Sequence, residues 1–190
     1  MDRSQALTIV KEFVKNENLI RHMLAVEASM RYYAAQFGGD IETWGITGLL
    51  HDFDWEIHPS MDQHPQDGAP ILRERGVPEE VITAILSHAN HTGIPRQSDM
   101  EKALCACDEI TGLIVAVALV RPSHSINDVK IKSVKKKWKD RSFAAGANRE
   151  EITEACMEFG VDLWEHVDNV ITAMRGIAPE LGLAGSDQAT

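Results

Sequence analysis

The chain has 190 residues, an ordinary apolar content of 44% and a net charge of -10. This length fits one domain with a sizeable core, or two small ones, and the negative charge disfavours general affinity for nucleic-acid polymers. Three cysteines without a CxxC pair, and an N-terminus without a signal-peptide pattern, predict a reducing, cytoplasmic location. The longest apolar run, Leu113 to Val120, is too short to cross a bilayer.

The first third of the chain carries apolar residues at helical spacing. One stripe covers Ser4 to Lys15, and a second runs from an N-cap at Asn18 to Phe37. Gly38-Gly39 ends the second helix, as glycine commonly does at helix C-termini. A third helix is predicted from a cap at Asp40 to His51-Asp52, followed by a loop from Phe53 to Asp62.

The remaining segments show the same periodicity. Helices are predicted from His64-Pro65 to Gly76, from Val77-Pro78 to His88, from Ser98 to Val120, after a cap at Ser125, from Asn148 to Gly160, and from Leu163 to Met174. No segment alternates as a strand does, and no Gly-rich phosphate loop or internal repeat is present. The sequence therefore predicts an all-α fold.

Several polar residues fall on the apolar faces or at the ends of these helices: His22, His51, Asp52, His64, His88 and Asp108. Each has an ordinary structural explanation, since a lone histidine is often a core residue and His51 can be satisfied by Asp52. A carboxylate in apolar surroundings, such as Asp108, is costly unless it is paired or bound to a metal ion. Imidazoles and carboxylates from several helices are the ligands with which helical folds build metal centres.

The order His22, His51-Asp52, Asp108 resembles the H…HD…D signature of the HD-domain superfamily of metal-dependent phosphohydrolases. His64 and His88 resemble the two extra histidines of members with a second metal ion, and the segment after Asp108 is similar to small bacterial HDIG-type proteins. The resemblance covers about residues 18 to 122. It implies an HD-domain bundle of about eight to nine helices in a single domain, 1–185. The HD core would span about 18–122, a C-terminal helical extension 123–183, and a frayed tail 184–190.

The resemblance also implies a metal-ligand set of His22, His51, Asp52, His64, His88 and Asp108, with one or two divalent ions. Imidazole and carboxylate without cysteine suit iron, manganese, cobalt, nickel or zinc. Two ions about 3.5–4 Å apart can hold a hydroxide for attack on phosphorus and clamp a phosphoryl oxygen. The expected function is hydrolysis of a phosphomonoester, phosphodiester or phosphoanhydride bond.

The expected substrate is a small phosphorylated compound, with a nucleotide favoured. We expect a monomer or homodimer without a nucleic-acid polymer or membrane as partner. One alternative is a degenerate HD module that binds metal or nucleotide without turnover. Another is a different reaction of the same fold, such as metal-assisted oxygenation.

The chain departs from many relatives directly after the HD pair. Those relatives read HD-apolar-Gly-Lys, with a lysine that contacts phosphate, whereas this chain has Asp54 and Trp55 at the last two positions. Asp54 is therefore a candidate catalytic residue beside Asp52, and Glu56 is an alternative for protonating the leaving group. His91 is a candidate substrate-binding residue that could also replace His88 as a metal ligand.

Basic residues are concentrated in one segment. Arg121 to Arg141 contains eight basic and two acidic residues, while the other 169 positions contain 11 basic and 27 acidic ones. Lys135 and Lys136 are candidates for attracting a phosphorylated substrate. The favoured alternative is that these lysines form the solvated face of an amphipathic helix whose other face is buried.

Overall fold

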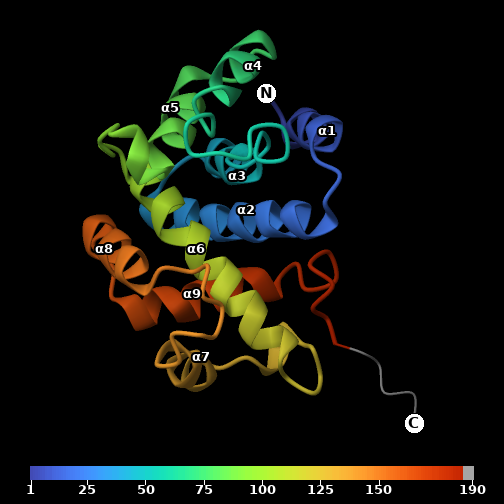
Figure 1. Ribbon diagram of the computed structural model, residues 1–190, viewed down its shortest axis with the longest axis vertical. Coiled ribbons are helices and arrows are strands. Elements are labelled where there is room, and N and C mark those ends of the chain that lie inside the picture. The colour runs from blue at the N-terminus through green and yellow to red at the C-terminus, as the bar shows by residue number, and fades with distance from the viewer. Residues whose placement is uncertain (186–190) are drawn as a thin grey trace.

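The computed structural model describes residues 1–185, and helices account for most of them (Figure 1). These residues form nine α-helices and two short 3₁₀ helices: α1 (Arg3–Phe13), α2 (Glu17–Phe37), α3 (Ile41–Leu50), α4 (Gly68–Glu74), α5 (Glu79–His88), η1 (Asn90–Thr92), α6 (Asp99–Leu119), η2 (Ile126–Asp128), α7 (Ile131–Trp138), α8 (Arg149–Phe159) and α9 (Leu163–Arg175). Within residues 1–185 the only extended pairing is an isolated antiparallel bridge between Ser125 and Ala184. The all-α prediction is confirmed.

Helix ends follow the capping chemistry of the sequence. The Asp40 carboxylate accepts the Thr43 N–H at the start of α3, and Ser98 with Glu101 forms a capping box at the start of α6. Gly38 ends α2 in the left-handed region with φ of 71°, a conformation that glycine adopts without a steric penalty. These local signals fix one end each of α2, α3 and α6.

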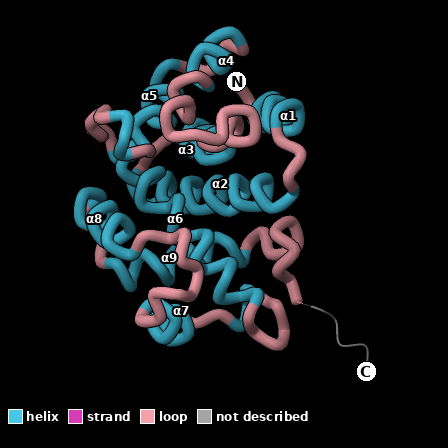
Figure 2. The backbone as a smooth tube through the Cα atoms, in the orientation of Figure 1, coloured by secondary structure: helices cyan, strands magenta, loops and turns pink. Residues whose placement is uncertain are grey.

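Four predicted boundaries were wrong. Asn16 rather than Asn18 caps α2, and the segment from 51 to 67 winds through turns so that α4 begins only at Gly68 (Figure 2). Ser125 caps the short η2 helix, while the lysine-rich α7 begins later without a side-chain cap. Ala184 is paired with Ser125 and so is not frayed; residues 186–190 of the predicted tail lie outside the described residues.

Helices α2 and α6 cross at the centre of the molecule, with α1, α3, α4 and α5 on one side and α7, α8 and α9 on the other (Figure 1). One hydrophobic cluster, which includes Leu49, Phe53 and Ile82, fills the first side. A second cluster, which includes Leu104 and Val170, fills the other. Since α2, α3, α5 and α6 pack against one another, polar residues on their facing sides are brought together. No helix among the described residues is both long and apolar enough to cross a membrane.

Candidate metal centre

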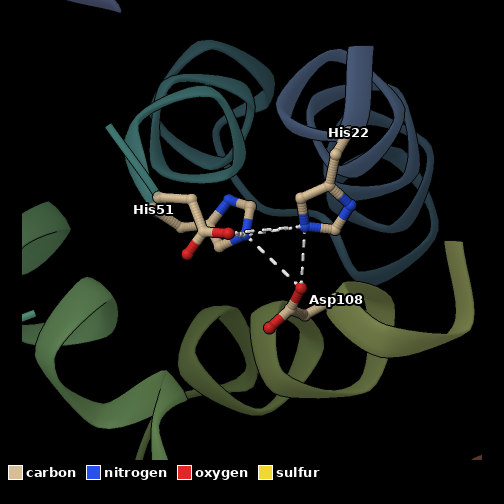
Figure 3. Close-up of side chains that lie close together, drawn as sticks. His22, His51 and Asp108 are labelled. Carbon is tan, nitrogen blue, oxygen red and sulfur yellow. Dashed lines mark hydrogen bonds and ion pairs between the residues drawn. The ribbon is translucent and has the colours of Figure 1, made fainter. Parts of the chain in front are cut away.

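Three helices bring one group of ligands together. His22 of α2, His51 directly after α3 and Asp108 of α6 point toward a common centre (Figure 3). The His22 Nε2 atom lies 3.0 Å from Asp108 Oδ1 and 3.2 Å from His51 Nε2. Asp52 completes the group, with its Oδ2 atom 3.4 Å from His51 Nε2 and 3.7 Å from His22 Nε2. One ligand atom from each of these four residues fits within 4.8 Å of all the others.

A second group uses the other oxygen of the same aspartate. Asp52 Oδ1 lies 3.3 Å from His64 Nε2 and 3.8 Å from His88 Nε2. The ligand atoms of these three residues again lie within 4.8 Å of one another. Asp52 therefore joins the two groups, and its carboxylate can bridge two ions as the side chain stands.

All four histidines present the same nitrogen to the centre. The Nδ1–H of His51 donates to the Gly48 carbonyl at 2.9 Å, and that of His88 donates to the Ile85 carbonyl. His64 Nδ1–H donates to Asp54 Oδ1 at 2.8 Å. His22 Nδ1–H donates to the Thr111 hydroxyl, which itself donates to the Asp108 carbonyl. These outer hydrogen bonds fix the tautomer and leave every Nε2 lone pair facing the centre, as metal-ligating histidines require.

The ligand group of His22, His51, Asp52 and Asp108 is electrostatically stable only with a positive charge between its atoms. Two imidazole nitrogens 3.2 Å apart repel each other if both present lone pairs, so a proton or a metal ion must lie between them. Burial lowers the pKa of His51, but the negative charges of Asp52 and Asp108 raise it by a larger amount, so that it lies at about 9. Burial raises the pKa of Asp108, while hydrogen bonds with His22 and His51 hold it well below its usual range. The residues therefore fit a divalent cation, which would replace the proton.

The donor set narrows the class of ion. Four imidazole nitrogens and two carboxylates, without a thiolate, suit transition metals of intermediate softness. Neither ligand group contains a cysteine. Cys107 and Cys156 are buried, and burial raises the pKa of the Cys105 thiol, which lines the adjacent cavity, to about 12.

Asp54 does not face the centre. Its carboxylate is fully buried and accepts hydrogen bonds from His64 Nδ1 at 2.8 Å and from His58 Nδ1 at 3.3 Å. A Cβ at Gly68 would lie 2.6 Å from Asp54 Cγ, so the space beside this carboxylate requires glycine. The structure thus places Asp54 behind a ligand rather than at the reacting atoms, and corrects its expected catalytic role to that of a positioning residue.

The candidates His91 and Glu56 belong to neither ligand group. His91 Nε2–H donates to the His64 carbonyl at 2.8 Å, so His88 rather than His91 points to Asp52, although His91 does line the adjacent cavity. Glu56 accepts backbone N–H groups of Lys15 and Asn16 and does not reach the cavity.

The lysines are not brought to the centre. Lys135 Nζ lies over the Trp164 ring, 4.8 Å from its centroid, and the residues that line the cavity include neither Lys135 nor Lys136. Helix α7 packs on α6 and α9 on the far side of the molecule from α3 and α5 (Figure 1).

A cavity of about 480 Å³ opens beside the two ligand groups. Its walls include Asp52, His64, His88 and Asp108, the apolar side chains of Trp55 and Met61, and the polar residues Asn90, Glu109 and Glu151. Burial raises the pKa of Glu109, the Asn148 N–H lowers it, and Asp108 raises it again, to about 7. Neither Glu109 nor Glu151 was singled out from the sequence. Glu109 follows Asp108 directly, but only the packing of α8 on α6 brings Glu151 to the same cavity.

The family model of the HD domain matches residues 19–118, more than half of the chain. The chain belongs to the HD domain family, and the resemblance inferred from its motifs is confirmed. Proteins with HD domains bind divalent metal ions and are generally hydrolases, and the histidine and aspartate cluster described above fits metal binding.

Two curated relatives are both named ribonuclease Y. The protein from a Nitratiruptor species is 33% identical over 96 residues, which cover 50% of this chain and 18% of the relative. The protein from Lawsonia intracellularis is 31% identical over 80 residues, covering 42% of this chain and 15% of the relative. The matched part is thus less than a fifth of each relative. No solved structure matches this chain significantly.

Proposed function

We propose that this HD domain is a metal-dependent phosphohydrolase that acts on a small phosphorylated compound and uses two divalent ions. The observation that carries the proposal is the division of the Asp52 carboxylate: one oxygen faces His22, His51 and Asp108, and the other faces His64 and His88. A carboxylate that bridges two ligand groups is the arrangement expected of a two-ion hydrolytic centre.

The chain's own residues prepare the site for this chemistry. When bound, divalent ions would supply Lewis acidity toward a phosphoryl oxygen and lower the pKa of a coordinated water molecule. The Nδ1 hydrogen bonds of the four histidines hold their Nε2 atoms toward the centre, so binding of a metal ion requires no change of tautomer. The cavity of about 480 Å³ beside Asp52 has room for a small phosphate ester.

A ribonuclease is a second candidate, because both curated relatives carry that name. RNA hydrolysis also breaks a phosphodiester bond, so the same ligand groups would serve. The net charge of -10 argues against affinity for a long polyanion. A small substrate therefore agrees better with this chain, with a nucleotide as the specific candidate.

The test begins with elemental analysis of the purified protein. The metal found is then restored, and hydrolysis is measured on phosphomonoesters, dinucleoside polyphosphates, cyclic nucleotides and a short RNA oligonucleotide. We expect turnover of at least one small ester, and loss of that turnover in Asp52→Asn. Asp168→Asn is the matched control, since Asp168 is an exposed residue of α9 outside the centre.

Tightly bound metal without hydrolysis of any compound would favour the binding module without turnover. Turnover of the RNA oligonucleotide alone would favour the ribonuclease.

A further inference from the structure

Two exposed apolar side chains border the cavity beside the metal centre. Trp55 and Met61 belong to the turn segment from 51 to 67, they are 40% and 63% exposed, and both line the cavity. Large apolar side chains that stay exposed beside a cavity are typical of ligand-binding surfaces, because a ligand can remove them from water. Trp55 and Met61 are therefore candidates for contact with the organic part of a substrate.

The Trp55 indole lies directly beside a metal-ligand candidate. Its ring centroid is 4.9 Å from that of His64, and the two ring planes are nearly perpendicular, at 89°. His64 in turn presents its Nε2 atom to Asp52 Oδ1 at 3.3 Å. This contact with His64 covers only part of the indole, since the residue remains 40% exposed. A phosphoryl group held at the ligand group of Asp52, His64 and His88 would thus have an exposed aromatic surface as its neighbour.

Other elements contribute further apolar atoms to the same cavity. Ala89 directly after α5, Cys105 of α6 and Ile152 of α8 all line it. A cysteine thiol behaves as a small apolar group in such a position. The cavity therefore combines a polar end, formed by the ligand groups, with apolar side chains from the turn segment and from three helices.

The polar end and the apolar side chains suit different parts of one molecule. A flat aromatic ring attached to the phosphoryl group could stack on the indole and contact the Met61 sulfur, and both contacts favour an aromatic partner. A saturated ring would gain only the burial of apolar area. A short polar chain would leave Trp55 and Met61 in water and gain nothing from either.

We propose that this site selects phosphate esters whose organic part contains a flat aromatic ring, with Trp55 as the main specificity-determining residue and Met61 as the second. The inference rests on the proposed function for its phosphoryl end. It concerns recognition, however, and can be tested by binding without turnover.

The test uses non-hydrolysable phenylalkylphosphonates with one to three methylene groups, each paired with its cyclohexyl counterpart, and 3-hydroxypropylphosphonate. Their dissociation constants are measured by calorimetry on the metal-loaded full chain. At the best length we expect the phenyl compound to bind at least about fivefold more tightly than the cyclohexyl compound, and the hydroxypropyl compound to bind most weakly. Burial of apolar area alone would favour the more hydrophobic saturated ring, so the order of the first two separates stacking from general apolarity.

Variants of the two side chains assign the preference. Trp55→Leu should abolish the preference for phenyl over cyclohexyl, whereas Trp55→Phe should keep most of it, because phenylalanine retains an aromatic face. Met61→Ala should weaken binding of the phenyl compounds about twofold or more. Ile57→Ala is the matched control for Met61→Ala, because Ile57 is 42% exposed on the same turn segment and does not line the cavity.

Indole fluorescence gives a second readout. The chain has four tryptophans, and Trp55→Phe keeps the other three. Binding of a phenylalkylphosphonate should change the emission of the wild type and leave that of Trp55→Phe unchanged.

Equal affinity for phenyl and cyclohexyl compounds at every length, a phenyl preference that survives Trp55→Leu, or no binding of any compound would overturn the inference. Metal content is measured in every variant, and loss of an ion from Trp55→Leu would also overturn it, by showing that the indole only supports His64. Failure to hydrolyse any ester would count against the proposed function and leave the ranking of the phosphonates measurable.

Discussion

The ligand group around His22 and the ligand group around His64 share one aspartate but are mounted on different kinds of structure. His22 and Asp108 stand within the two long central helices, α2 and α6, where backbone hydrogen bonds and the core fix their positions. His64 lies in the turn segment from 51 to 67, and a side-chain hydrogen bond to Asp54 orients its ring. The comparison teaches that His22 and Asp108 are held by the two central helices, whereas the orientation of His64 depends on one side-chain hydrogen bond within a turn segment.

The largest effect is expected from Asp52→Ala, because both groups lose a ligand at once. We expect the metal content to fall from about two ions per chain toward zero, and any hydrolytic activity to be lost. Elemental analysis measures the content, with Asp168→Ala as the control. Retention of both ions would show that the groups do not share this residue.

Single histidine variants should separate the halves. His22→Ala should reduce occupancy of the first group, and His64→Ala or His88→Ala should lower the metal content from about two ions toward one. His124→Asn is a suitable control, since His124 is exposed and has a positive φ that asparagine tolerates. If His64→Ala and His88→Ala both keep full metal content, the second group is structural.

Asp54→Asn should weaken the second ion without removing it. Loss of the charged partner of His64 Nδ1 is expected to reduce affinity for that ion about 10- to 100-fold, while the first ion is retained. Gly68→Ala should act in the same direction, because its Cβ would displace the Asp54 carboxylate. A chelator titration followed by metal analysis measures both affinities. Equal weakening of the two ions would contradict the asymmetry between the halves.

The anchoring of α6 can be tested through His166. This buried imidazole donates from Nε2 to the Ala106 carbonyl and accepts from the Tyr33 hydroxyl at Nδ1. Burial lowers its pKa from 6.5 to about 4, so the unfolded chain binds a proton at intermediate pH that the folded chain does not.

The free energy of unfolding should therefore fall as the pH decreases from 6.5 toward 4, with His166 accounting for about 3 kcal/mol. Urea unfolding across this range should show a shallower decrease for His166→Gln than for the wild type. Parallel pH profiles of the two proteins would contradict the assignment.

The smallest effect is expected on the lysine helix. Lys136→Gln should change the free energy of unfolding by less than about 0.5 kcal/mol, and Lys135→Gln by up to about 1 kcal/mol because it loses the contact with the Trp164 ring. Both variants should leave metal content and substrate affinity unaltered, because neither residue lines the cavity. Denaturant unfolding and steady-state kinetics are the measurements. A severalfold loss of substrate affinity in either variant would restore these lysines as substrate contacts.

Much of the fold follows from local signals that the sequence displays. Asp40, Ser98 and Asn148 cap the helices that were predicted to follow them, because a side-chain oxygen before an apolar stripe satisfies free N–H groups. The start of α2 was misplaced because Asn16 and Asn18 are equally suitable as caps. Ser125 was assigned to the wrong helix because a capped 3₁₀ turn has the same local signature as a helix start.

The site was less completely predictable. Helical periodicity shows which face a residue occupies, so it placed His22 and Asp108 inward. It does not apply to the turn segment from 51 to 67, where the direction of each side chain depends on tertiary contacts. Asp54 was therefore assigned to the reaction when it lies behind His64. Glu151 carried no signal in the sequence, because the packing of α8 on α6 joins residues far apart in the chain.

His51 and His88 end their helices in the same way. Each imidazole donates its Nδ1–H to the carbonyl three residues earlier, at Gly48 and Ile85, and points its Nε2 atom toward Asp52. Each imidazole thus satisfies a carbonyl at the end of its helix and presents a metal-ligand atom, and it does so through residues of a single helical turn. Such a helix end is a portable unit: grafted onto the C-terminus of an unrelated helix, it should present an oriented imidazole without help from the rest of this protein.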